Sequence, residues 1–139
     1  DFIKSHGMML CFHAGKDCAY PSTYYASPKS IAKVADDFKG IKIIAAHLGG
    51  WNVWQEVLEY EAGKDIYFDT AYLKGMISDD EVKKILNHHS KERILLGSDC
   101  PWSSPIKERE YFEKFLSTNE IELICDKNAT ELKSEAERG

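Results

Sequence analysis

The chain has 139 residues, of which 43% are hydrophobic and 29% charged, a balance typical of a folded globular domain and not of a disordered segment. Its net charge of -5 is spread along the chain without basic clusters, which argues against nucleic-acid binding and favours a small-molecule partner. The apolar runs are far shorter than the roughly 20 residues that cross a bilayer, and the first residues lack a signal-peptide pattern. We therefore predict a cytoplasmic protein that does not enter a membrane.

The hydrophobic pattern predicts strands and helices in regular alternation. Residues 1–6 have the character of the last turn of a helix that ends at Gly7. Apolar runs predict four strands, at residues 8–12, 42–46, 66–68 and 94–97. Capping residues and apolar faces at helical spacing predict helices that begin near Ser27, Val53, Ser78, Pro105 and Ser117. We interpret Asn128 as the N-cap of a last helix, and the polar residues 134–139 as a frayed tail.

Four strand and helix units in succession, with short connections, indicate an α/β fold with a parallel sheet covered by helices. Three of the strands are continuously apolar, as expected for strands that are buried on both faces. Two architectures fit this pattern. One is an open, doubly wound sheet, and the other is part of a (β/α)8 barrel.

Residues suited to chemistry stand at the ends of the predicted strands. His13 follows the first strand, His47 the second, Asp69-Thr70 the third and Asp99 the fourth. In a barrel the carboxyl ends of the strands share one rim, so these side chains would surround one pocket. Taken singly, each histidine is more often a hydrogen-bonded structural residue, and an aspartate there can simply cap a helix. Their recurrence at equivalent positions favours a shared site.

These strand ends resemble those of a known family. FHAG, AHLGG, YFDTA, LLGSDCPW and the later Asn128-Ala129 are similar to successive motifs of the amidohydrolase superfamily. The similar branch is the amidohydrolase-related one, which contains metal-dependent hydrolases and aminocarboxymuconate-semialdehyde-type decarboxylases. The resemblance covers nearly the whole chain but corresponds to strands five to eight of the family's TIM barrel. It implies that residues 1–133 form the C-terminal half of a barrel, followed by the polar tail at 134–139.

A full barrel needs roughly 250 residues, whereas this chain has 139 and begins inside a helix. We therefore expect a fragment of a longer gene product, inactive by itself. A half-barrel also has two edge strands, here residues 8–12 and 94–97, whose open backbone groups favour self-association.

The resemblance also implies roles for individual residues. His13 matches a metal ligand, and His47 matches a residue that polarises or deprotonates the substrate or the metal-activated water. Asp99 matches a residue that binds the metal and moves a proton. Zn²⁺ suits this mixture of nitrogen and oxygen donors, and Mn²⁺ is also compatible. The family takes further ligands from a His-x-His motif, which this sequence does not contain, so it stays open whether this chain holds a metal by itself.

Three aromatic residues follow the strand ends closely and could line a pocket for a flat or carboxylated substrate: Trp51, Tyr72 and Trp102. The alternative is that both tryptophans pack between helices and barrel. The loop after His13, with Asp17 and several tyrosines, could cover such a pocket. Hydrolysis and decarboxylation fit the same set of residues equally well.

Two other classes of protein share parts of this pattern. A half-barrel could act as a non-enzymatic binding or assembly module through its strand edges. A receiver or nucleotide-binding domain would need a Gly-rich phosphate loop or clustered acids after the first strand, and the sequence has neither. The cysteines are too sparse for a disulfide scaffold and form no Cys-x-x-Cys motif, so we predict reduced thiols at Cys11, Cys18, Cys100 and Cys125.

Overall fold

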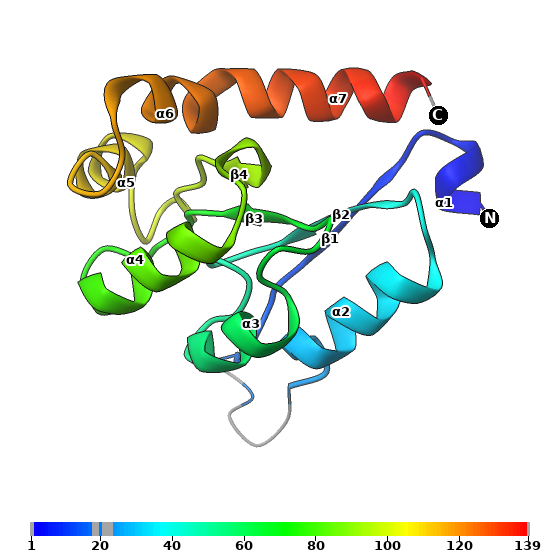
Figure 1. Cartoon of the computed structure of the whole chain (residues 1–139), viewed down its shortest axis with the longest axis horizontal. Coiled ribbons are helices and arrows are strands. Elements are labelled where there is room, and N and C mark those ends of the chain that lie inside the picture. The colour runs from blue at the N-terminus through cyan, green and yellow to red at the C-terminus, as the bar shows by residue number, and fades with distance from the viewer. Residues whose placement is uncertain (1, 18–19, 21–23, 139) are drawn as a thin grey trace.

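The computed structural model describes residues 2–17, 20 and 24–138 (Figure 1). Four parallel strands form one sheet in the order β1-β2-β3-β4, and the predicted α/β class is confirmed. The strands are β1 (Met9–Phe12), β2 (Lys42–Ala45), β3 (Tyr67–Asp69) and β4 (Ile94–Leu95). The strand order follows the chain without the reversal that defines a doubly wound sheet, so this part of the chain has the topology of a barrel segment.

Helices connect and flank the strands largely where the sequence predicts them. They are α1 (Phe2–Ser5), α2 (Pro28–Asp37), α3 (Trp54–Tyr60), α4 (Asp79–His88), the 3₁₀ turn η1 (Lys91–Arg93), α5 (Pro105–Phe112), α6 (Thr118–Glu122), the π-helical η2 (Leu123–Lys127) and α7 (Asn128–Arg138). Ser27 caps α2, and the capping boxes that begin at Ser78 and Ser117 both form. Hydrogen bonds from local side chains therefore set the start of these helices. None of the helices in the described ranges is long and apolar enough to cross a membrane.

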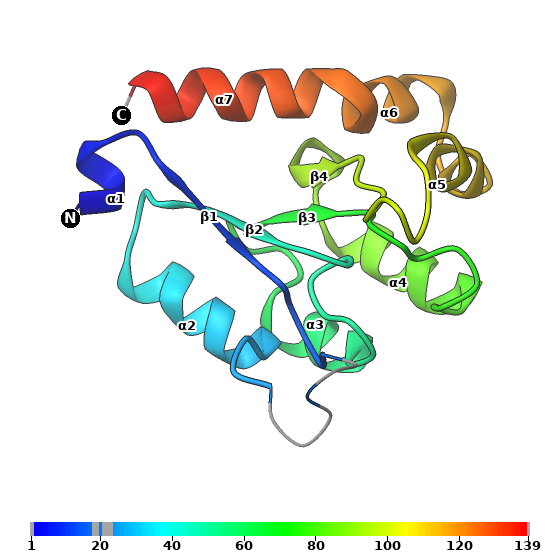
Figure 2. The ribbon, with the colours of Figure 1, turned by 180° about the vertical axis from the view of Figure 1, so that it is seen from behind.

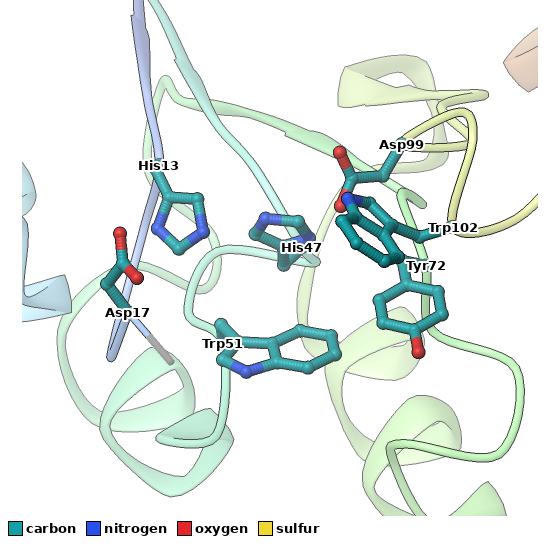
Figure 3. Close-up of a pocket in the computed structure, with 7 residues that line it drawn as sticks. All are labelled: His13, Asp17, His47, Trp51, Tyr72, Asp99 and Trp102. Carbon is teal, nitrogen blue, oxygen red and sulfur yellow. The ribbon is translucent and has the colours of Figure 1, made fainter. Parts of the chain in front are cut away.

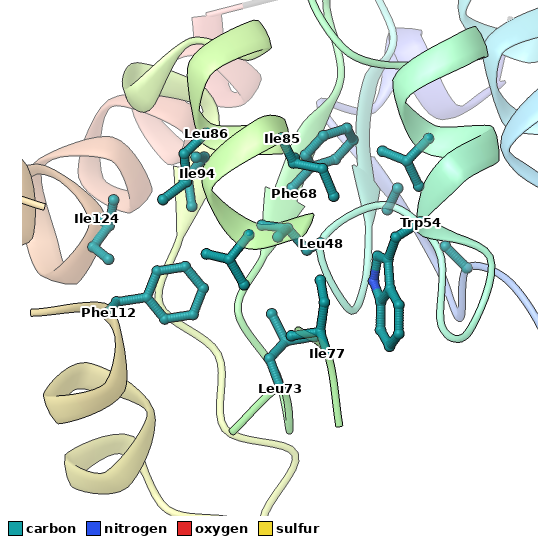
Figure 4. Close-up of a cluster of buried hydrophobic side chains, with 14 of the residues drawn as sticks. Leu48, Trp54, Phe68, Leu73, Ile77, Ile85, Leu86, Ile94, Phe112 and Ile124 are labelled. Carbon is teal, nitrogen blue, oxygen red and sulfur yellow. The ribbon is translucent and has the colours of Figure 1, made fainter. Parts of the chain in front are cut away.

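The sheet lies between two layers of helix. In both views α2, α3 and α4 lie on one side of the strands and α7 lies on the other (Figures 1 and 2). The main core fills the side of α2 to α5 and includes Phe68, Ile85, Ile94 and Phe112, all fully buried (Figure 4). Alternate residues on the strands face α7, where a smaller cluster joins Tyr67 and Leu95 to Leu132. Burial on both faces explains the apolar sequences of β2 and β4. The prediction of two buried faces is wrong for β1, whose residues at the edge of the sheet are exposed or half-buried.

The end of the chain differs from the sequence prediction. Asn128 is not an N-cap, because α6, η2 and α7 follow one another without a break. Its buried side chain instead donates hydrogen bonds to the carbonyl oxygens of Lys91 and Ile94, each at 2.7 Å. The residues from 134 to 138, expected to fray, continue α7, and Glu135 forms an ion pair with Lys42. The domain boundary at residue 133 stays a prediction.

The two predicted edge strands are the edges of the sheet, but they differ in how open they are. β1 has β2 on one side. The edge of β4 is partly covered, because the amide of Leu96 donates to the carbonyl of Ile124 in η2 at 2.8 Å. This bond, with that of the Gly97 amide to Thr70 Oγ1 at 3.0 Å, takes residues 96–97 out of the strand pairing. β4 is therefore shorter than the predicted 94–97.

Candidate functional site

A cavity of about 360 Å³ lies at the carboxyl ends of the strands (Figure 3). Each strand or the loop that follows it contributes to the wall. The lining residues are His13, Asp17, His47, Trp51, Tyr72, Asp99 and Trp102. The structure thus brings the six predicted site residues to one cavity, together with Asp17 from the loop after β1. Asp69 and Thr70, also expected around the pocket, do not line it.

His47 is the most firmly held of these side chains. Its backbone is left-handed (φ 58°), and only 4% of the residue is exposed. Its Nδ1 lies 2.9 Å from the carbonyl oxygen of Ala71. Because a carbonyl oxygen only accepts, Nδ1 carries the hydrogen, and Nε2 is the basic nitrogen of the neutral ring. A fixed tautomer with one free lone pair is what a general base requires.

His13 and Asp99 lie on either side of His47, and both are exposed (Figure 3). The rings of His13 and His47 meet edge to face at 4.8 Å between centroids. Asp99 also has a left-handed backbone (φ 55°), and its carbonyl oxygen accepts the amide of Trp102 at 2.9 Å. This turn places a carboxylate at the rim of the cavity.

The donors of the cavity suit a divalent metal in type but not in number. An imidazole and a carboxylate are ligands that Zn²⁺ and Mn²⁺ both accept. Within the described ranges, no group of three or more His, Cys, Asp or Glu side chains is close enough to hold a metal ion. His13 and Asp99 can therefore supply part of a coordination sphere, and any further ligands must come from outside this set.

Aromatic rings form the other wall of the cavity. Trp51 stacks on Tyr72 with their planes 9° apart and their centroids 5.5 Å apart, and it also meets the ring of His47. Trp51 is buried and contacts Trp54, and it also lines the cavity. It therefore packs in the core and forms part of the cavity wall. Trp102 is 71% exposed and is not packed between helices. The ring of Trp102 is therefore open to a flat ligand, whereas that of Trp51 is largely covered by its neighbours.

Close backbone contact holds Trp51 beside the first strand end. Its amide donates to the carbonyl of Ala14 at 2.7 Å, and its own carbonyl accepts the amide of Lys16 at 2.9 Å. Gly15 lies between these contacts with φ 89°, and a Cβ there would lie 2.3 Å from the backbone nitrogen of Trp51. The glycine of the FHAG motif is therefore required by this approach of the two loops.

Comparison with known families decides the wider relationship. The model of a family described as Amidohydrolase matches residues 2–132. The chain belongs to the amidohydrolase family. The resemblance inferred from the strand ends is thus confirmed. No curated protein sequence matches the chain.

Solved structures with the fold of this amidohydrolase chain include three from different bacteria. An uncharacterised TIM-barrel protein from Bordetella bronchiseptica matches 99% of this chain and 49% of its own, with 22% identity and a TM-score of 0.76. A dihydroxybenzoic acid decarboxylase from Polaromonas, with bound manganese and the inhibitor 2-nitroresorcinol, matches 95% and 51%, with 16% identity and a TM-score of 0.63. A candidate 2-pyrone-4,6-dicarboxylic acid hydrolase from Pseudomonas putida matches 96% and 54%, with 16% identity and a TM-score of 0.64.

The chain spans about half the length of the structures it matches. Its four parallel strands and their helices therefore correspond to half of a TIM barrel, as the sequence predicts. At these levels of identity the likeness shows the fold alone.

Two residues that support the amidohydrolase cavity were given no individual role from the sequence. Asp69 ends β3, and its Oδ1 accepts the amides of His47 and Ala71. Burial raises the pKa of the Asp69 carboxyl, these two amides oppose the rise, and the charge of Asp99 adds to it. The sequence shows Asp69 at a strand end, like His13, but gives no sign that its carboxylate holds the neighbouring loop.

Glu108 had no comparable signal, because it lies within α5 among charged neighbours. The residue is fully buried, and its Oε2 accepts the amides of Leu73 and Lys74 at 3.1 and 3.2 Å. Its Oε1 accepts the hydroxyl of Ser103 at 2.5 Å. Glu108 thereby joins α5 to the loop that carries Tyr72 into the cavity.

Proposed function

We propose that this chain supplies half of the active site of a metal-dependent TIM-barrel hydrolase, in which water attacks a C–N, ester or related bond. The observation that carries the proposal is the convergence of His13, His47 and Asp99 on one cavity at the carboxyl ends of the strands. Function in barrels of this kind is built at that rim. Membership of the amidohydrolase family supports the same class of chemistry.

In the proposed site His13 and Asp99 hold a divalent metal, with further ligands from the rest of the whole protein. The mixed donors favour Zn²⁺, and Mn²⁺ is the second candidate, supported by the manganese bound in the decarboxylase from Polaromonas. When bound, such a metal lowers the pKa of water and polarises a carbonyl oxygen. The exposed carboxylate of Asp99 is placed to accept a proton from attacking water and return it to the leaving group.

His47 acts beside the metal site through its ring. The hydrogen on Nδ1 is held by Ala71, so Nε2 can accept a proton or, once protonated, donate one to a developing negative charge. Because the residue is buried and hydrogen-bonded at its backbone, the ring needs little reorganisation during the reaction. We propose that Trp51, Tyr72 and Trp102 bind the flat part of the substrate.

Decarboxylation is the second candidate function. The stacked Trp51 and Tyr72 and the exposed Trp102 give the cavity an aromatic wall, and one of the matched structures is a decarboxylase of an aromatic acid. In this version Asp99 or His47 protonates the carbon that loses carbon dioxide. The same residues serve both reactions, so the substrate decides between them.

The proposal includes a setting for the protein. We propose a cytoplasmic protein that acts on a small molecule and does not bind nucleic acid or membrane. The open edge of β1 is the place where a further strand, from the same protein or from a second copy, would pair.

The test uses the whole protein that contains this chain, supplied with Zn²⁺ or Mn²⁺. Amide, ester and aromatic carboxylate substrates are screened, and release of carbon dioxide separates decarboxylation from hydrolysis. His47→Ala is expected to lower kcat by about 10²- to 10⁴-fold, the range for loss of a general acid or base. His88→Ala, which changes an exposed histidine on α4, is the matched control and is expected to leave kcat unchanged. Equal activity of His47→Ala and the wild type would contradict the assignment.

A further inference from the structure

Asp69 contacts His47 and its neighbours directly. A single oxygen of Asp69, Oδ1, accepts the backbone amide of His47 at 2.9 Å and that of Ala71 at 3.0 Å. The backbone carbonyl of Asp69 accepts the amide of Leu48 at 2.7 Å. The end of β3 thereby holds two adjacent residues, His47 and Leu48, of the loop after β2.

These bonds form a closed circuit through Ala71. The carboxylate of Asp69 accepts the amide of Ala71, and the carbonyl of Ala71 accepts the Nδ1 hydrogen of His47. Asp69 therefore orients both parts of His47. It holds the backbone by a direct hydrogen bond, and it holds the ring through Ala71. Among the residues that the structure describes, Asp69 is the one carboxylate with an observed hydrogen bond to His47.

The loop needs such support because its backbone is strained. His47 and Leu48 have φ values of 58° and 54°, and L-residues pay roughly 1–2 kcal/mol each in this conformation. Two polar contacts from Asp69 to these residues, each worth about 1 kcal/mol net, are of the size needed to offset much of that cost.

The fold also makes room for the carboxylate. Gly97, in the loop after β4, lies against Asp69, and a Cβ at that position would lie 3.2 Å from the Cβ of Asp69 and 3.3 Å from that of Ala71. Any larger residue would press on the two groups that orient His47. The glycine of the LLGSD stretch therefore belongs to the same arrangement.

We propose that Asp69 is a positioning residue, which sets the left-handed turn of His47 and fixes its ring as the Nδ1–H tautomer. Its consequence for turnover rests on the role proposed for His47, but the orientation itself can be measured without any reaction. In the whole enzyme, loss of Asp69 would lower kcat with little change in KM, because the substrate contacts remain.

The test uses the whole protein that contains this chain, ¹⁵N-labelled and at neutral pH, with the tautomer of His47 read from long-range proton–nitrogen correlation spectra. The wild type and Asp69→Asn, which keeps an acceptor oxygen in place, are expected to show the Nδ1–H form. Asp69→Ala is expected to lose this single tautomer. The matched control is Asp80→Ala, which removes an exposed carboxylate on α4 and is expected to keep the Nδ1–H form.

A folded Asp69→Ala chain that keeps the Nδ1–H tautomer would overturn the proposal. A second measurement covers the case in which that variant does not fold. In the wild type the amide protons of His47 and Ala71 should exchange with solvent more slowly than that of exposed Asn52, and equal rates would also overturn it. If instead His47→Ala leaves turnover of the whole protein unchanged, the proposed function fails while the tautomer result still decides the role of Asp69.

Discussion

The carboxyl and amino ends of the strands differ in backbone strain and in the pairing of buried polar groups. The non-glycine residues with a left-handed backbone, as far as the structure describes the chain, all lie in loops that follow strand ends: His47, Leu48, Asn52, Tyr72 and Asp99. At the amino ends, buried polar groups are paired with backbone. Asn128 bonds the carbonyls before and within β4, and both ring nitrogens of His89 are bonded, to the amide of Gly63 and the carbonyl of Ile66.

This contrast separates a stabilising end of the sheet from a functional one. Backbone strain of roughly 1–3 kcal/mol per residue persists only where the surrounding structure holds it, and it concentrates at functional sites. In barrels the carboxyl rim carries function and the opposite end carries stability. Substitutions at the two ends should therefore have different signatures.

The largest expected effect concerns Glu61, which lies behind the strained loop after β2. The residue is fully buried, its carboxyl oxygens have no hydrogen-bond partner among the described residues, and Oε2 would lie 2.7 Å from a Cβ on Gly49. Burial raises the pKa of Glu61 to about 9. The unfolded chain ionises near 4.5, so stability is greatest below that pH and falls by up to about 1.4 kcal/mol per pH unit as pH rises toward 9.

Glu61→Gln is expected to remove this loss, so that the variant gains on the wild type by several kcal/mol toward alkaline pH. Urea unfolding between pH 4.5 and 9 measures the difference. Glu59→Gln, an exposed neighbour on α3, is the control and should follow the wild-type profile. Parallel profiles for Glu61→Gln and the wild type would show that the carboxyl is not held neutral.

The next effect tests the amino ends of the strands. Asn128→Ala leaves the buried carbonyls of Lys91 and Ile94 without their donor, and is expected to cost about 2–4 kcal/mol of unfolding free energy. Asn119→Ala, at an exposed position on α6, is expected to change it by less than about 0.5 kcal/mol. Denaturant unfolding compares the two. If Asn128→Ala costs no more unfolding free energy than Asn119→Ala, the Asn128 side chain does not stabilise the amino ends of the strands.

A third effect is the mirror image of that at Glu61. Burial lowers the pKa of His89 to about 4, so the unfolded chain binds its proton first as pH falls below 6.5. Stability present above 6.5 is therefore lost toward pH 4, by up to about 1.4 kcal/mol per pH unit. His89→Gln should flatten this acid limb of the profile, whereas His88→Gln, at an exposed position, should keep it. An unchanged limb in His89→Gln would assign the acid loss to other groups.

Some of these features can be predicted from the sequence and others cannot. The strands, the capping boxes at Ser78 and Ser117, and the convergence of His13, His47 and Asp99 depend on local patterns and on the geometry of parallel sheets, so they were predictable. The pairing of Asn128 with the turn before β4 was not, because it joins residues 34 and 37 positions apart, and a local cap explained the same residue.

The buried carboxyls show the same limit. Glutamate side chains are ordinarily exposed, yet Glu61 and Glu108 are both fully buried. Their burial follows from packing between elements that are distant in sequence. The thiols fit their prediction in part, since Cys11, Cys100 and Cys125 are free, whereas Cys18 lies outside the described residues. Tertiary contacts, not composition, decide such cases.

The smallest expected effect tests the strain at the carboxyl rim directly. Asn52 is exposed with φ 59° in the loop between Trp51 and α3, so a substitution there changes backbone preference with little change in packing. Asn52→Ala is expected to destabilise the chain by about 1 kcal/mol, because alanine lacks the tolerance of asparagine for this conformation. Asn52→Gly should be neutral or stabilising by a few tenths of a kcal/mol, since glycine adopts it freely. Thermal unfolding of both variants measures the pair. If alanine and glycine proved equally stable there, the left-handed backbone would carry no cost at this position, and the contrast between the two ends would rest on buried polar pairing alone.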